Sequence, residues 1–164
     1  MAREAERARE VLGGILSRMG IDATIDVRED ADKTFLDIHG PEAGLVIGKK
    51  GQTLEALQYL VAKAVHRPHG DPNDPNGNDD EGYRPIVVDA EGYRSRREAT
   101  LVEMAQRLGE KAIRTQTPIT MNPMSPHDRR IIHITLDKVP GVTTRSEGEG
   151  IFRRLLIVPA PDKV

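Results

Sequence analysis

Two glycines enclose two lysines in the segment Gly48-Lys49-Lys50-Gly51, where the residue types could bind an extended anionic ligand. A glycine carries no side chain, so the backbone here can come very close to a bound molecule. The apolar pattern after the segment predicts a helix, and the N–H groups at a helix start suit a phosphate. The two lysines add positive charge at the same place. By spacing alone, however, a plain turn between two helices with solvated lysines is the simpler interpretation.

Arg129 and His133 are the second pair of residues that could bind such a ligand, because they stand four positions apart. In a helix two such residues share one face, with about 6 Å between their Cβ atoms. The arginine offers a forked donor for phosphate, and the histidine can donate a hydrogen bond or stack on a base. Arg130 lies beside them and adds charge. Spacing alone favours an ordinary surface pair, so the surrounding sequence has to decide.

A basic cluster beside a tyrosine begins a long helical pattern in the second half of the chain, with Tyr93, Arg94, Arg96 and Arg97. Such a cluster can contact phosphates and stack a base. It can equally be a solvated helix end that links two domains. The sequence leaves both interpretations open.

Two further groups of side chains invite a metal-binding or catalytic interpretation. The first group lies in a proline-rich, irregular stretch, which argues against preformed metal-ligand geometry. Helix capping explains the second group better than a catalytic nucleophile does. The chain also has no P-loop motif and no dinucleotide fingerprint. We therefore expect no metal, no cofactor, no catalytic residue and no enzymatic activity. The first group is His66, His69, Asp71 and Asp74, and the second is Ser125, His127, Asp128 and His133.

The overall charge of the chain does not by itself indicate a nucleic-acid ligand. The 164 residues include 24 basic and 26 acidic side chains, a net charge of −2. Five acids fall in the Pro-, Gly- and Asn-rich stretch 69–82, and setting these aside turns −2 into +3. The chain has no cysteine, which is compatible with a reducing compartment, and no apolar run near the roughly 18 residues of a membrane helix. We expect a cytoplasmic protein without an integral membrane segment.

The apolar periodicity of the first half predicts the element order αββααβ. Asp30–Asp32 is the expected turn between the two strands, and Leu54, Leu57, Leu60 and Val61 form the expected apolar face of the third helix. The predicted elements are helices over 5–19, 41–47 and 54–65, and strands over 21–27, 34–38 and 86–88.

The second half predicts the order αβαββ. Ser125 is the expected N-cap of its second helix, with Pro126 at the first helical position and Asp128 three residues after the cap. The chain is therefore predicted to be an α+β protein of two small domains, 1–90 and 91–164, with 69–82 as a flexible acidic loop. The predicted elements of the second domain are helices over 93–117 and 126–139, and strands over 117–121, 142–145 and 153–158.

The stretch Gly44–Gln58 closely resembles the signature of a KH domain, and the order αββααβ resembles its bacterial type II form. In that family the GxxG loop holds a short single strand by its backbone, while a hydrophobic groove receives the bases. The resemblance implies that Gly48, Lys49, Lys50 and Gly51 contact RNA, with further contacts expected from Ile47 and Gln52. Val46 and Ile47 are groove or core residues, and the core role is favoured for each.

The stretch Met121–His133 resembles the centre of an R3H domain, which is named for an Arg, three residues and a His. That family binds single-stranded nucleic acid. The resemblance places Arg129 and His133 at the motif positions, with Arg130 beside them. From the basic cluster described above, Tyr93, Arg94 and Arg97 are candidates for additional RNA contacts.

The two domains in this order resemble the bacterial Jag family, also called SpoIIIJ-associated or KhpB-type RNA-binding proteins, over residues 2–159. The resemblance implies binding of single-stranded RNA, with single-stranded DNA as the other candidate ligand. It further implies post-transcriptional regulation linked to cell growth and envelope synthesis, and pairing with a small KH-domain protein or a second copy. Many members carry an additional N-terminal domain, whose functions the resemblance over residues 2–159 does not imply.

Two rival functions stay open at this point. In the first, the chain is a protein-interaction adaptor whose KH fold serves dimerisation or docking without RNA. An acidic pair at positions 49 and 50 would favour this function, whereas the chain has two lysines there. In the second and weaker one, the chain is a nuclease acting through His133.

Overall fold

We describe residues 2–66 and 84–160 in a computed structural model of the chain. The chain forms two compact units, which we call unit 1 (residues 1–94) and unit 2 (residues 95–164). The expected acidic loop 69–82 lies outside the described residues. Among the described residues, none of the helices combines the length and the apolar composition that a membrane-spanning segment needs.

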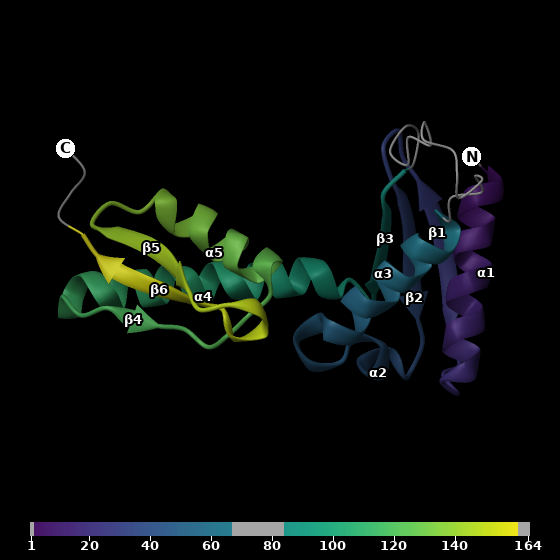
Figure 1. Ribbon diagram of the computed structural model, residues 1–164, viewed down its shortest axis with the longest axis horizontal. Helices are drawn as coiled ribbons and strands as arrows, with labels where there is room; N and C mark the ends of the chain where they lie inside the picture. The colour runs from purple at the N-terminus through teal and green to yellow at the C-terminus, as the bar shows by residue number, and fades with distance from the viewer. Residues whose placement is uncertain (1, 67–83, 161–164) are drawn as a thin grey trace, which may run out of the picture. The chain divides into compact units, whose positions relative to one another are not determined.

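Unit 1 has the predicted order αββααβ (Figure 1). Strand β2 is central, pairing antiparallel with β1 and parallel with β3. The loop of the GxxG segment forms a short 3-10 turn, η1, between α2 and α3. The elements are α1 (Ala2–Arg18), β1 (Thr24–Glu29), β2 (Thr34–His39), α2 (Ala43–Ile47), η1 (Lys49–Gly51), α3 (Gln52–Val65) and β3 (Ile86–Ala90).

Short polar contacts close the predicted β1–β2 turn. The carboxylate of Asp30 accepts hydrogen bonds from the N–H groups of Asp32 (2.8 Å) and Lys33 (2.7 Å). These two bonds favour the ionised form, so they lower the pKa of Asp30. The turn sets the register in which Leu36 and Ile38, both fully buried, project from one face of the sheet.

Helices α1 and α3 pack on that face and complete the core of unit 1. The prediction that Leu60 belongs to the buried face of α3 is wrong, because its side chain is 51% exposed. Successive helical residues turn by about 100°, so Leu60 points outward when its neighbour Val61 points inward. The largest fully buried side chains of the unit are those of Leu12, Leu36, Ile38, Val46, Leu54, Val61 and Val88.

Unit 2 has the predicted order αβαββ, with a 3-10 turn, η2, between its last two strands. Its sheet has the order β4-β6-β5, and both pairings are antiparallel. Helix α4 begins at the last residues of unit 1. The elements are α4 (Tyr93–Thr115), β4 (Ile119–Thr120), α5 (Pro126–Asp137), β5 (Val142–Glu147), η2 (Gly150–Phe152) and β6 (Arg154–Pro159).

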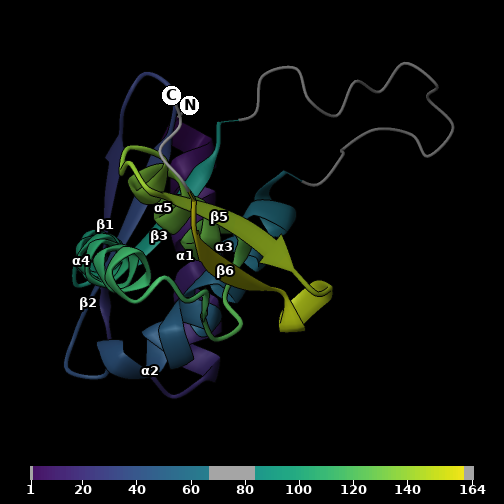
Figure 2. The same ribbon diagram turned by 90° about the vertical axis from the view of Figure 1, so that its left-hand side faces the viewer.

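Both helices of unit 2 contribute to one apolar cluster on one face of the sheet. Leu101 of α4, Ile132 and Leu136 of α5, and Leu155 and Ile157 of β6 meet there. Alternate residues of a strand share a face, so the side on which Leu155 and Ile157 lie is the side that the helices cover. Figures 1 and 2 show α5 running beside β5 on this side.

Replacing a buried leucine of α3 should be much more damaging than replacing an exposed one. Leu57→Ala should lower the free energy of unfolding by about 2–5 kcal/mol, because this residue is 3% exposed and its loss leaves a cavity. Leu60→Ala is the matched control on the same helix and should change it by less than about 0.5 kcal/mol. Urea unfolding followed by circular dichroism measures both. Equal losses would contradict the orientation of α3.

Candidate nucleic-acid interface

The GxxG loop of unit 1 has a backbone that only glycine adopts easily at its first position. Gly48 has φ 67° and ψ −167°, and a Cβ atom there would overlap with Oγ1 of Thr53. Lys50 and Gly51 also have positive φ angles, of 54° and 83°. The predicted role of the first glycine, a tight bend without a side chain, is therefore required by this geometry.

The two lysines face away from the interior, whereas the second glycine is buried. Lys49 and Lys50 are exposed, and Gly51 is covered by the ring of Tyr93, whose Cε1 would lie 2.7 Å from an added Cβ. The ring of Tyr93 thus packs against the loop on the side of the protein interior. Because both lysines are exposed, a ligand can reach their side chains.

The residues beside the loop divide between core and surface. Val46 is fully buried, in agreement with the favoured core role, and Ile47 is half-buried against the same core. Gln52 is exposed at the first position of α3. Of the residues next to the loop, Gln52 is therefore the more accessible to a ligand.

Arg94 and Arg97 use their guanidinium groups inside the protein. Arg94 donates from Nε to the carbonyl of Val88 (2.9 Å) and from Nη2 to Oε1 of Gln58 (2.8 Å). Arg97 donates from Nη2 to Oδ2 of Asp128 at 2.6 Å. These contacts favour a structural role for both arginines over contact with a ligand.

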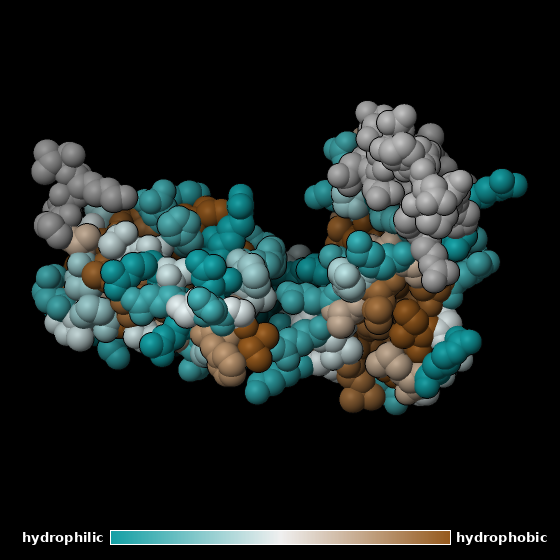
Figure 3. All heavy atoms as spheres, viewed as in Figure 1, coloured by the Kyte–Doolittle hydropathy of each residue, from teal (hydrophilic) through white to brown (hydrophobic). Residues whose placement is uncertain are grey.

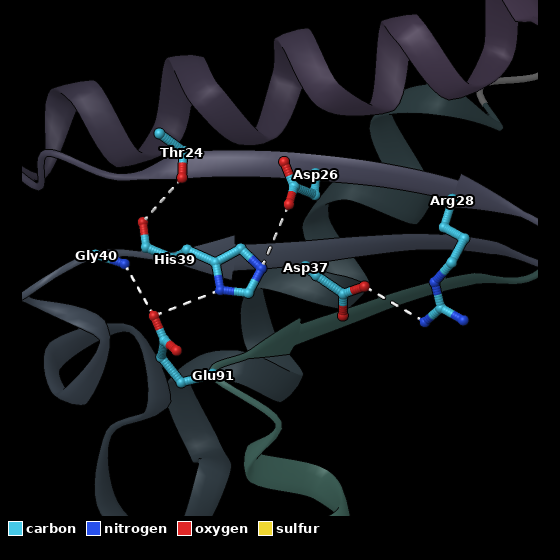
Figure 4. Close-up of polar contacts among 7 residues, drawn as sticks. All are labelled: Thr24, Asp26, Arg28, Asp37, His39, Gly40 and Glu91. Atoms are coloured by element: carbon cyan, nitrogen blue, oxygen red, sulfur yellow. Dashed lines mark hydrogen bonds and ion pairs between the residues drawn. The ribbon is translucent and has the colours of Figure 1, made fainter.

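The open face of the unit 1 sheet is acidic. Asp26, Asp37 and Asp89 lie side by side on β1, β2 and β3. Figure 4 shows His39 between Asp26 (3.7 Å) and Glu91 (3.5 Å), and Glu91 also accepts the N–H of Gly40 at 3.1 Å. Arg28 pairs with Asp37 at 3.4 Å, but the acids of this face still outnumber its arginine, so the face disfavours phosphates. In unit 1 the loop, and not this sheet face, is the surface suited to a polyanion.

In unit 2 a hollow of about 520 Å³ lies between α5 and β5. It brings together the three predicted residues of the second motif, Arg129, Arg130 and His133. We call it the α5–β5 hollow. Its lining residues are Pro126, His127, Arg129, Arg130, His133, Thr144, Ser146 and Leu155.

Hydrogen bonds from β5 hold two of the basic side chains in place. Nη1 of Arg129 donates to Oγ of Ser146 at 3.2 Å, and Nδ1 of His133 lies 2.5 Å from Oγ1 of Thr144. In the register of β5 with β6, Ser146 is opposite Leu155 and Thr144 is opposite Ile157. Both hydroxyls therefore lie on the helix-covered side of the sheet, where they can reach α5.

The α5–β5 hollow has donors without a matching carboxylate. No acidic residue is among the residues that line it, and Nε of Arg129 is buried without a hydrogen-bond partner in the described part of the chain. Arg130 and His133 are exposed at its surface. Guanidinium, imidazole and hydroxyl groups that converge in this way suit a phosphate.

Asp128, which precedes Arg129 in the sequence, is turned away from the hollow. It is 5% exposed, and its carboxylate pairs with Arg97. Its own N–H donates to Oγ of Ser125 at 3.2 Å, which confirms the predicted N-cap. Because this carboxylate pairs with Arg97, it does not neutralise Arg129 and Arg130, whose positive charge can act on a ligand.

Sequence reasoning missed Thr144 and Ser146. The predicted strand ended at Arg145, whereas β5 continues to Glu147 and includes Ser146. The available signal was the alternation of two hydroxyl residues in a strand, which puts both on one face. His127, considered only for catalysis, also lines the hollow.

No group of three His, Cys, Asp or Glu side chains in the described ranges is placed to hold a metal ion. Of the metal-like set in the sequence, His66 lies with Nε2 3.0 Å from Oε1 of Glu4. The other members of that set are outside the described residues.

Replacing Gly48 should damage the loop, whereas replacing its neighbour Gly44 should not. Gly48→Ala should lower the free energy of unfolding by about 1–3 kcal/mol, because alanine is strained at this backbone conformation and would meet Thr53. At Gly44, within α2, a Cβ would meet no atom within 4 Å, and alanine is the better helix former. Thermal unfolding of both variants measures the difference. A Gly48→Ala protein as stable as the wild type would contradict the loop geometry.

Comparison with protein families identifies both units. A KhpA/KhpB KH domain model matches residues 5–72, and an R3H domain model matches residues 99–159. The two matches contain the GxxG loop and the α5–β5 hollow, respectively. They confirm the KH and R3H domains that the two motifs predicted.

Individual relatives match both units together. RNA-binding protein KhpB of Clostridium symbiosum is 36% identical over 139 residues, covering 85% of this chain and 58% of the relative. The protein of the same name from Bacillus subtilis is 34% identical over 154 residues, covering 93% of this chain and 69% of the relative. That from Lactiplantibacillus plantarum is 30% identical, with 90% and 42% covered. The chain thus spans between about two fifths and two thirds of the length of these relatives, and it belongs to the KhpB family.

Proposed function

We propose that the chain binds single-stranded RNA through two backbone contacts, the GxxG loop of unit 1 and the α5–β5 hollow of unit 2. The observation that carries this proposal is the hollow itself, where Arg129, Arg130 and His133 gather with no lining carboxylate. The name that the relatives share, RNA-binding protein KhpB, supports RNA as the ligand. The chain thereby acts as a binding protein.

In the α5–β5 hollow a phosphate is the group to be recognised. Arg129 is already oriented by Ser146, so less side-chain entropy is lost when a ligand binds. Its guanidinium can present parallel N–H groups to two phosphate oxygens. His133, held by Thr144, donates a further hydrogen bond or stacks on a neighbouring base.

In unit 1 the strand lies along the exposed side of the loop, with its phosphates near Lys49 and Lys50. The glycines allow the tight bend that presents both lysines to the solvent, and the exposed ammonium groups displace counterions from the phosphates. Two weak contacts on one chain raise the effective concentration for the second contact. The affinity of the whole chain then exceeds that of either unit.

The cellular role that we infer rests on the family resemblance and on the composition of the chain. We infer a protein of the cytoplasm that acts on RNA without cleaving it, and whose binding serves post-transcriptional regulation linked to growth and envelope synthesis. The lack of cysteine fits a reducing compartment. If a 5′-labelled RNA incubated with the protein is shortened, and His133→Ala abolishes the shortening, the inference of a non-enzymatic role is wrong.

Reversing the charge of the loop should weaken RNA binding and its dependence on salt. Lys49→Asp with Lys50→Asp removes the ammonium groups that neutralise phosphates, and the salt slope of log Kobs should fall by about 0.7 for each phosphate that is no longer neutralised. Lys33→Asp with Lys63→Asp makes the same charge change elsewhere in unit 1 and should have a much smaller effect. Fluorescence anisotropy with a short single-stranded RNA at several salt concentrations measures both. Equal effects of the two pairs would remove the loop from the mechanism.

Removing the paired basic side chains of the α5–β5 hollow should weaken binding without unfolding unit 2. Arg129→Ala with His133→Ala deletes charge-assisted hydrogen bonds, each worth about 1.5–3 kcal/mol. The affinity should therefore fall at least tenfold, while the melting temperature changes little because neither residue belongs to the apolar cluster. Anisotropy and thermal unfolding are the two measurements. A large loss of melting temperature would instead make these residues structural.

A protein-interaction function is the second candidate, and one observation favours it. Leu45 and Leu60 are 62% and 51% exposed, and apolar side chains gather over α2 and α3 in Figure 3. Such a surface suits a small KH-domain protein or a second copy of the chain. Sedimentation of the wild type and of Leu60→Asp, with RNA affinity measured in parallel, separates the two functions. An adaptor would lose association but have no RNA affinity to lose.

A further inference from the structure

Unit 2 exposes two large apolar side chains at the turn between β5 and β6. Ile151 is 83% exposed and Phe152 is 73% exposed, more than any other large hydrophobic residue in the described ranges. Figure 3 shows apolar side chains gathered at this turn, away from the apolar cluster of the unit. Keeping such residues in water is unfavourable, so a partner that covers them would gain their burial.

The turn that carries the phenylalanine is held by its own hydrogen bonds. The N–H of Phe152 donates to the carbonyl of Glu149 (3.1 Å), and that of Arg153 donates to the carbonyl of Gly150 (3.3 Å). The carbonyl of Phe152 also lies 3.2 Å from the place where a Cβ on Gly148 would be, and Gly148 has a φ of 86°. The backbone that carries the exposed ring is therefore ordered by local bonds and close packing.

The turn lies close to the α5–β5 hollow, as a covalent connection and a backbone hydrogen bond both show. Along the chain, Leu155, which lines the hollow, is three residues from Phe152, at most about 10 Å. Across the fold, the N–H of Met124 donates to the carbonyl of Arg153 (3.3 Å), and Pro126, two residues after Met124, lines the hollow. A ligand of a few nucleotides in the hollow can therefore reach the ring.

The charges around the ring suit a polyanion. Arg153 and Arg154 follow it directly and are both exposed. Of the two acids in the preceding residues, Glu147 is paired with Arg145 at 2.7 Å, which leaves Glu149 as the opposing charge. An aromatic face beside two arginines is the combination that binds single strands by stacking and by phosphate contact.

We propose that Phe152 is a stacking platform for an unpaired base of the strand whose phosphate occupies the α5–β5 hollow. This inference rests on the proposed function and adds the chemical group that the second site recognises, a nucleobase face. Ile151 covers the edge of the stacked base, and Arg153 and Arg154 contact the phosphates on either side. Because every base has such a face, the contact selects unpaired strands over duplexes and tolerates any base.

The first test replaces the ring and restores it. Phe152→Ala should weaken binding of a short unstructured RNA by roughly 5- to 100-fold, the loss expected for one base–aromatic stack, and Phe152→Trp should restore it. Tyr59→Ala removes an aromatic side chain that is 63% exposed in unit 1 and is the matched control, with little change expected. The melting temperature of each variant should stay within a few degrees, because these side chains are exposed.

The second test identifies the group that the ring contacts. An RNA with one abasic site is moved along the sequence in steps, and at the position facing Phe152 the wild type should lose affinity while Phe152→Ala loses none. A 2-aminopurine at that position should change its fluorescence on binding to the wild type only. Equal affinity of wild type and Phe152→Ala for every RNA would overturn the inference.

The outcomes keep this inference apart from the proposed function. If the wild type binds RNA and Phe152→Ala binds it equally well, the stacking platform is wrong and the two backbone contacts stand. If the wild type binds no single-stranded RNA at all, the proposed function itself fails. If Phe152→Ala binds RNA normally but no longer self-associates in sedimentation, the turn is a contact between copies of the chain, and the stacking platform is again wrong.

Discussion

The ion pair between Arg97 and Asp128 is the interaction on which the basic site of unit 2 depends. It joins α4 to the first turn of α5, where a carboxylate is also favoured by the partial positive charge of the helix start. Asp128 is 5% exposed, so removing Arg97 would leave a buried charge without a partner. The same pair directs the carboxylate away from Arg129. One contact therefore fixes the helix and keeps its outer face basic.

Acidic and basic side chains lie on different surfaces of each unit, which explains how a chain with a net charge of −2 can bind a polyanion. The aspartates of the unit 1 sheet lie in a row on its open face, whereas Lys49 and Lys50 lie on the loop. In unit 2 the basic side chains of α5 face hydroxyls of β5 instead of acids. Local charge, and not total charge, decides where a phosphate can bind, because exposed charges are screened beyond about 10 Å in 0.1 M salt.

Much of the fold could be predicted because local patterns determine it. The order of elements in both units, the Asp30 turn and the Ser125 cap follow from periodicity and from capping chemistry, which act over a few residues. Leu60 was misplaced because several leucines and valines in one helix allow more than one apolar face. The helix position relative to the sheet, which decides between those faces, is a tertiary property.

The sites were predictable only in part, for a related reason. Helical spacing placed Arg129 and His133 on one face, and the glycine pattern predicted the bend at Gly48. The partners of Arg94 and Arg97 and the hydroxyls of Thr144 and Ser146 depend on contacts between residues 6 to 36 positions apart. No local pattern specifies such contacts. The family resemblance supplied the context that spacing alone lacked.

The most direct measurement is a titration of the isotopically labelled chain with single-stranded RNA, followed by amide chemical shifts. Two groups of signals should shift, one at residues 48–52 and one around 127–133 and 144–146. Signals on the acidic face of the unit 1 sheet should stay in place. Shifts confined to that face, or to α3 around Leu60, would contradict recognition of the RNA backbone at the loop and the hollow.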